Sequence, residues 1–331
     1  MKRLGLKLSG GIGRALSHKI KQTQRLSRKT AALVLLLVGA ALVSLVSLGF
    51  ARLADYALHL NREWSRQYPL AAFAVLPAAM MLIVWFTRRY APYTAGSGIP
   101  QVLAMLSMPK VKGGNRLVAL GRTVWKIPLT FLGMLAGASI GREGPSVQVG
   151  AAVMLAWGSW CKRYNLAFKR LQDKELLAAG AAGGLAAAFN APLAGVIFAI
   201  EELGRSVSLH WERQIFIGVL ASGFFLVAIE GNSTYFHGFH AGQPAEHMLR
   251  WALLCAAVCG VAGGLFARFL SKGATWLALP QWRNWMRRHP IWLAGVFGLM
   301  LAALGVLFDG QTYGTGYDVA AAALHGQTDL A

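Results

Sequence analysis

Two short segments combine glycines and a proline with a side chain that can do chemistry, and an apolar run follows each. They read Gly96-Ser97-Gly98-Ile99-Pro100 and Gly141-Arg142-Glu143-Gly144-Pro145. Proline is favoured in the first turn of a helix, so each segment predicts a helix start. The first amides of a helix lack internal partners and carry roughly half a positive charge, which favours an anion. We expect five residues of the two segments to bind an anion: Ser97, Gly98, Ile99, Arg142 and Gly144.

Glu143 gives this predicted site its chemistry. A carboxylate at an anion-binding helix start is itself an anion, so it would compete with a free anion for the same place. Protonation would remove its charge and free the place, which would link proton binding to anion binding. The hydroxyl of Ser97 is a donor suited to a monatomic anion such as chloride. The alternative is an ordinary turn in which Glu143 faces water or pairs with Arg142.

A second acidic position follows a segment rich in small residues, 180–195, which allows helices to approach closely. This segment continues through apolar residues into Glu201 and Glu202, which adjoin Arg205. We expect one of these carboxylates to load protons from the cytoplasmic side; the alternative is a helix-end carboxylate paired with Arg205. Lys126 opens the helix before Glu143 and is either a pathway residue or a lysine that extends to the membrane interface.

The composition predicts membrane helices that position these residues. Of the 331 residues, 56% are hydrophobic and 14% charged, against about 25% charged in ordinary soluble domains. Uncharged or apolar runs lie at 31–51, 70–86, 127–140, 146–160, 176–200, 215–229, 251–267 and 291–308. Several are short and broken by glycine or proline, which predicts half-helices that meet inside the protein. The chain is therefore expected to be an all-α polytopic membrane protein.

The net charge of +20 could indicate a nucleic-acid partner, but its distribution does not. Lysine and arginine concentrate in residues 1–29, and the first acidic residue of the chain is Asp55. This asymmetry follows the positive-inside rule, which predicts a cytoplasmic N-terminus and no nucleic-acid partner. Anionic membrane lipid is a candidate partner of the basic segment. The expected location is a bacterial inner membrane.

Metal and enzyme chemistry have little support. Three cysteines are too few for a disulfide framework or a metal site: Cys161, Cys255 and Cys259. Three histidines gather in a predicted outer loop without a usual metal spacing: His237, His240 and His247. A membrane enzyme built on Glu143 and Arg142 would lack a Ser/His pair, paired histidine ligands or a nucleotide motif. We expect no enzyme activity, no cofactor and no metal.

At these residues the chain resembles the CLC family of chloride channels and chloride/proton exchangers. The resemblance rests on the two glycine-proline segments and on the run Ala187-Ala188-Phe189-Asn190-Ala191-Pro192-Leu193-Ala194-Gly195, which leads to Glu201 and Glu202. The order and spacing match the family pattern over approximately residues 30–331. The resemblance implies a homodimer with one anion pathway per subunit, each subunit being built from two inverted halves with re-entrant half-helices.

The resemblance also implies roles for single residues. Ser97 resembles the central anion-coordinating serine, and Glu143 resembles the external gating glutamate. Glu202 matches the internal proton-transfer glutamate of exchangers, and Lys126 matches a lysine near that internal route. Leu103 departs from the pattern, because some exchangers carry a carboxylate there near the proton entry.

The C-terminal part departs further from the family pattern. A second glycine-rich helix start and a tyrosine that closes the inner side of the site are not found, since Tyr313 and Tyr317 lie in an expected loop. We expect four parts: a basic cytoplasmic segment, a first membrane repeat, an external loop and an incomplete second repeat, at 1–30, 31–230, 231–250 and 251–331.

The activity expected from this organisation is chloride/proton antiport, with Glu143 as gate and Glu202 as internal proton acceptor. One alternative is a passive chloride channel gated by voltage or pH. Another is an inactive fragment that needs the missing C-terminal half, which a partner polypeptide could supply.

Overall fold

A computed structural model describes residues 2–108, 116–164, 166, 172–204, 213–231, 236, 247–276, 284–286 and 288–326. The side chains of 2–29, 213–214 and 273–276 lie outside this description. The described residues form helices and turns and contain no strand, as the sequence predicts. Most of the predicted external loop 231–250 lies outside the described residues, and so does Arg205.

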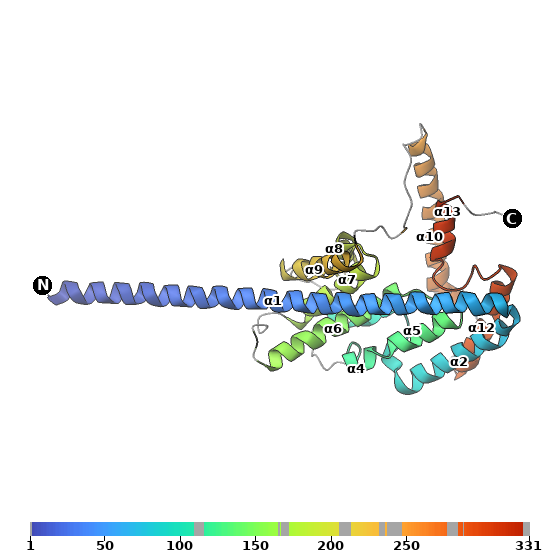
Figure 1. Ribbon diagram of the computed structural model, residues 1–331, viewed down its shortest axis with the longest axis horizontal. Coiled ribbons are helices and arrows are strands. Elements are labelled where there is room, and N and C mark those ends of the chain that lie inside the picture. Colours follow the sequence, from blue (N-terminus) through green and yellow to red (C-terminus); the bar gives the residue numbers. More distant parts are fainter. Residues whose placement is uncertain are drawn as a thin grey trace.

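Four helical stretches are long and apolar enough to cross a membrane, judged by length and composition. They are Thr30–Gln67, Pro69–Tyr90, Met248–Lys272 and Pro290–Leu307. The first belongs to α1 (Lys2–Gln67), which runs along the body of the molecule and extends well beyond it at its N-terminal end (Figure 1). The others correspond to η1 (Pro69–Ala71) with α2 (Ala72–Tyr90), to α10 (Met248–Trp276) and to α12 (Pro290–Leu307).

Shorter helices fill the space beside α1. They are α3 (Ile99–Ser107), α4 (Leu120–Thr123), α5 (Lys126–Leu135), α6 (Glu143–Arg163), α7 (Asp173–Ala188), α8 (Pro192–Phe198) and α9 (Arg213–Glu230). The prediction of short, broken helices is confirmed. The apolar run 176–200 is interrupted at residues 189–191, where Asn190 has a φ of +51° and Pro192 begins a new helix. Asparagine tolerates this left-handed conformation better than most residues do.

The core forms where α6 lies against α7, and glycines allow the close contact. A methyl group added at Gly150 would collide with the carbonyl oxygen of Gly180 and would lie 2.9 Å from the Cα of Gly184. Such small-residue interfaces let helix backbones approach each other directly. Side chains of α3 and α9 complete this core, among them Val102, Met105 and Ile215. The helix that begins at Glu143 is therefore held rigidly.

The turn between α5 and α6 is tied to α1. The carbonyl oxygen of Leu135, at the end of α5, accepts hydrogen bonds from Asn61 Nδ2 and Trp64 Nε1, each 3.1 Å long. These donors satisfy a carbonyl that the helix itself leaves unpaired. Gly137 then turns the chain with a φ of +92° toward the start of α6.

The C-terminal helix α12 packs against α2, whereas α10 lies apart. A methyl group added at Gly298 of α12 would lie 2.6 Å from the Cα of Pro77 in α2. By contrast, α10 projects away from the body, and its described side chains are exposed, including Cys255 and Cys259 (Figure 1). The expectation that both Tyr313 and Tyr317 lie in a loop is half right. Tyr313 lies in a turn, but Tyr317 is the first residue of α13 (Tyr317–Leu324).

Candidate functional site

The two predicted helix starts lie in contact. Gly98 precedes the first residue of α3 with a φ of +106°, a conformation that favours glycine, and Pro100 lies in the first turn. A methyl group added at Gly144 of α6 would lie 2.8 Å from the carbonyl oxygen of Ser97 and 2.9 Å from its Cβ. The structure thus brings together the segments 96–100 and 141–145. Their unpaired amides lie at the ends of two helices that meet at Ser97.

Glu143 is the first residue of α6. Pro145 lies in the first turn of this helix, where a proline removes no internal hydrogen bond. The carboxylate is partly buried, and its Oε2 lies directly over the Cα of Gly141, where a Cβ would collide with it. A negative charge at this position is stabilised by the helix dipole.

Lys126 lies at the other side of the α3 start. It is the first residue of α5 and is 3% exposed, so it is not a lysine that reaches the interface. Its Nζ donates hydrogen bonds of 2.8 Å to the carbonyl oxygen of Gly96 and to Oε1 of Gln148. The ammonium also lies 3.0 Å from the point where a methyl group at Gly98 would be. A buried positive charge therefore adjoins the turn that opens α3.

Gln148 was missed by the sequence interpretation. It is fully buried on α6, and its Nε2 donates to the carbonyl oxygens of Tyr93 at 3.1 Å and Leu117 at 2.8 Å. The signal was present: it is the one amide side chain in the apolar run 146–160. A buried polar side chain in such a run needs partners, which marks it as a structural or functional position.

Further cations lie near Tyr93, which precedes α3 in η2 (Pro92–Thr94). The guanidinium of Arg122 lies 5.2 Å from the centre of the tyrosine ring. A hydrogen bond from Arg116 lowers the pKa of the Tyr93 phenol below its usual value. The approach to the α3 start on this side is therefore electropositive.

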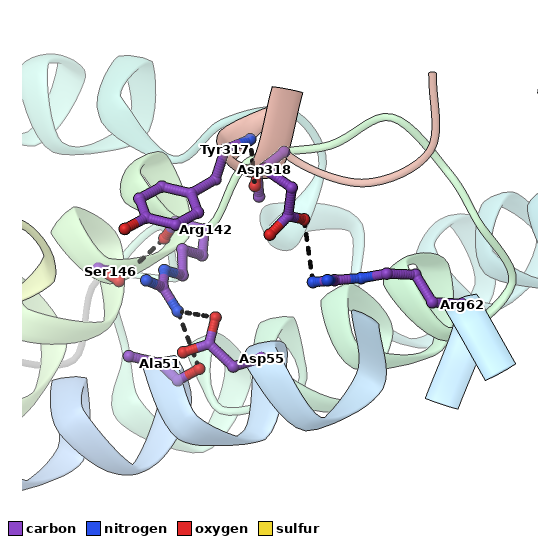
Figure 2. Close-up of polar contacts among 8 residues, drawn as sticks. Ala51, Asp55, Arg62, Arg142, Ser146, Tyr317 and Asp318 are labelled. Carbon is purple, nitrogen blue, oxygen red and sulfur yellow. Dashed lines mark hydrogen bonds and ion pairs between the residues drawn. The ribbon is translucent and has the colours of Figure 1, made fainter. Parts of the chain in front are cut away.

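Arg142 connects α6 to α1. Its Nη1 lies 3.0 Å from the carbonyl oxygen of Ala51 and 2.5 Å from Oδ1 of Asp55 (Figure 2). Its own carbonyl oxygen accepts a 2.9 Å hydrogen bond from the Ser146 hydroxyl. The bonds of Nη1 thus fix the position of the residue before Glu143. An anion-binding role for Arg142 stays a prediction.

A second ion pair links α1 to α13 in the same region. Arg62 Nη2 lies 2.9 Å from Asp318 Oδ2, and both side chains are largely exposed (Figure 2). Asp55 and Arg62 are both on α1, so this helix contacts the starts of α6 and α13 through charged side chains.

Glu201 and Glu202 lie apart from the meeting point of α3 and α6. They belong to the π-helical turn η4 (Ala199–Leu203) that continues α8, and both side chains are exposed. Their expected neighbour Arg205 lies outside the described residues. Leu103 packs against the apolar core that contains Ala199 and Leu203. The structure places Glu202 on a surface and does not bring it into contact with Glu143 within the described part of the chain.

Within the described residues, no group of three or more His, Cys, Asp or Glu side chains is arranged to hold a metal ion. Cys161 is buried, and Cys255 and Cys259 lie on α10. Ser97 offers a hydroxyl donor and Glu143 a carboxylate at the meeting point of α3 and α6, and anion and proton binding there stay predictions.

Comparisons with known proteins match the chain to one family. The family model described as "Voltage gated chloride channel" matches residues 79–331. The H⁺/Cl⁻ exchange transporter ClcA of Vibrio parahaemolyticus is 32% identical over 292 residues, which cover 81% of this chain and 58% of that protein. The ClcA protein of Vibrio vulnificus strain YJ016 is 34% identical over 80% of this chain and 57% of its own length. The chain therefore spans less than two thirds of these relatives.

Solved structures show the same fold. A slow cyanobacterial Cl⁻/H⁺ antiporter, 26% identical, matches with a TM-score of 0.70 over 90% of this chain and 68% of its own. A CLC-type fluoride/proton antiporter, 22% identical, matches with a TM-score of 0.66 over 90% of this chain and 71% of its own. Together with the family match, these findings show that this all-α integral membrane protein belongs to the voltage-gated chloride channel family, the CLC family.

Proposed function

We propose that this chain carries the chloride pathway of a chloride/proton antiporter, in which Glu143 is the gate. One observation supports this most strongly: the starts of α3 and α6 meet at Ser97 and Gly144, and Glu143 is the first residue of α6. The names of the matched relatives, which are exchange transporters, favour the same reaction.

In this mechanism, chloride occupies the space at the two helix starts. The amides of Gly98 and Ile99, the hydroxyl of Ser97 and the amides around Gly144 donate to it, because these first-turn amides have no acceptor within their helices. When Glu143 is ionised, its carboxylate competes for the same amides. A proton on Glu143 removes that competition, so each proton taken up favours chloride entry.

Glu202 is proposed to accept the proton on the internal side. Its exposed position on the π-helical turn suits exchange with water, and water or other side chains would carry the proton from there to Glu143. Lys126 contributes a buried positive charge beside Gly98. This charge would attract chloride to the α3 start.

The proposed assembly is a homodimer in a bacterial inner membrane, surrounded by lipid and with a cytoplasmic N-terminus. The proposed parts are the basic segment 1–30, the first repeat 31–230, the loop 231–250 and the second-repeat segment 251–331. The excess of lysine and arginine in residues 1–29 supports the orientation.

The test is chloride efflux from liposomes that contain the purified protein, with external pH recorded at the same time. The proposal predicts that outward chloride flow drives protons inward against their gradient. Glu143→Ala and Glu202→Ala are expected to abolish proton movement while chloride flow persists. Glu63→Ala is the matched control, because Glu63 is an exposed carboxylate on α1 far from both positions in the sequence.

Chloride flow without proton movement in the unaltered protein would instead identify a passive channel. No flow from folded, reconstituted protein would overturn the proposed transport by this chain and would favour the inactive-fragment alternative.

A further inference from the structure

The amide side chain of Gln148 has a fixed orientation inside the protein. Nε2 donates to two backbone carbonyl oxygens, those of Tyr93 and Leu117. Rotating the amide by half a turn would place its oxygen against both carbonyl oxygens and its NH₂ group against the Lys126 ammonium. That arrangement would lose three hydrogen bonds of a fully buried group, so Oε1 must face Lys126.

This orientation determines where the Lys126 ammonium lies. The two acceptors of Nζ in the described part of the chain are Gln148 Oε1 and the Gly96 carbonyl oxygen, both at 2.8 Å. The second acceptor belongs to the turn that opens α3. Because a methyl group at Gly98 would touch both Gln148 and Nζ, the amide, the ammonium and the helix start form one packed unit.

The chemistry of the acceptors matters as much as their position. Both are neutral, so they satisfy two of the three ammonium hydrogens without cancelling the charge. A carboxylate in the place of the amide would have a similar shape but would neutralise the lysine. A purely apolar side chain would leave the buried ammonium with a single acceptor and free to move.

We propose that Gln148 is a positioning residue of the anion pathway, which holds the Lys126 ammonium against Gly96 and Gly98 without neutralising it. Chloride affinity at the α3 start then depends on Gln148 through Lys126. The inference rests on the proposed function, because Gln148 would act on the proposed chloride site through Lys126.

The experiment measures chloride binding to the purified 331-residue protein by titration calorimetry, with thermal unfolding followed in parallel. Gln148→Glu is expected to weaken chloride binding about tenfold or more, because a negative charge replaces a neutral acceptor. The matched control is Gln311→Glu, which makes the same change at an exposed residue of the turn before α13 and should leave the affinity unchanged.

A double-mutant cycle separates positioning from packing. Gln148→Met should weaken chloride binding when Lys126 is present and have no further effect when it is combined with Lys126→Met. An equal loss in both backgrounds would overturn the positioning role, since Gln148 would then act without the lysine. Should Gln148→Met not fold, Gln148→Asn takes its place in the same cycle, because the shorter amide cannot keep the 2.8 Å hydrogen bond with Lys126.

Failure of the inference and failure of the proposed function give different results. An unaltered protein that binds chloride, together with folded Gln148 variants of unchanged affinity, would overturn the inference alone. An unaltered protein that does not bind chloride would overturn both.

Discussion

Among single residues, Gly144 matters most for the site, because its lack of a side chain allows the two helix starts to lie in contact. The backbone of Ser97 lies where a side chain at Gly144 would be, so the two helix starts approach each other more closely than any other residue would allow. Glu143, next in the chain, is held between this contact and the Arg142–Asp55 ion pair. The contacts of the neighbouring residues on both sides therefore fix the position of the proposed gate.

Gly144→Ala is predicted to weaken chloride binding about tenfold, because its methyl group would push Ser97 and the α3 amides away from α6. Titration calorimetry measures this directly. Gly121→Ala is the control, since a methyl group there would meet no atom within 4 Å. An unchanged affinity in Gly144→Ala would mean that the two helix starts do not bind the anion together.

At the scale of helices, the contact between α6 and α7 holds the site in place. Gly150, Gly180 and Gly184 bring the two backbones together, and every residue of α6 from Pro145 to Leu155 is buried. The packing of α6 therefore fixes the backbone of Glu143 relative to Ser97.

Gly150→Ala is predicted to destabilise the fold by about 1–3 kcal/mol, because its methyl group would overlap the backbone of α7. The measurement is thermal unfolding in detergent. The same substitution at Gly263 of α10 meets no atom within 4 Å and should leave the unfolding temperature unchanged or slightly raised. Equal unfolding temperatures for Gly150→Ala and the unaltered protein would contradict the close α6–α7 contact.

Particular residues show how far the sequence alone could predict this arrangement. The glycine-proline pattern predicted both helix starts, because glycine and proline act on the local backbone. It did not reveal that α6 begins at Glu143 or that Tyr317 begins a helix, since helix limits also depend on packing. The Lys126–Gln148 and Arg142–Asp55 contacts join residues far apart in the chain, and no local pattern encodes such pairs.

In the whole molecule, the length and orientation of α1 determine on which side of the membrane the start of α6 lies. Its segment Thr30–Gln67 is about 57 Å long at 1.5 Å per residue, more than a hydrocarbon core of ~30 Å needs. Asp55 and Arg62, near its C-terminal end, contact the starts of α6 and α13 (Figure 2). With a cytoplasmic N-terminus, Glu143 would be reached from the opposite side of the membrane.

This orientation predicts opposite labelling at the two ends of that segment. In a variant whose three native cysteines are replaced by serine, Gln67→Cys should react with a membrane-impermeant maleimide in intact cells. Thr30→Cys should react only after the cells are permeabilised. Both positions are exposed, so access to the reagent depends on the side of the membrane. The reverse pattern would place the N-terminus outside.

Glu143 and chloride are proposed to compete for the helix starts of α3 and α6, and chloride binding to Glu143→Gln measures this competition. The substitution keeps the shape of the side chain and removes its negative charge. If the carboxylate competes with chloride, Glu143→Gln will bind chloride more tightly than the unaltered protein at neutral pH, and acidification will strengthen binding only in the unaltered protein. Equal or weaker binding by Glu143→Gln, or the same pH dependence in both proteins, would show that the carboxylate does not compete with chloride.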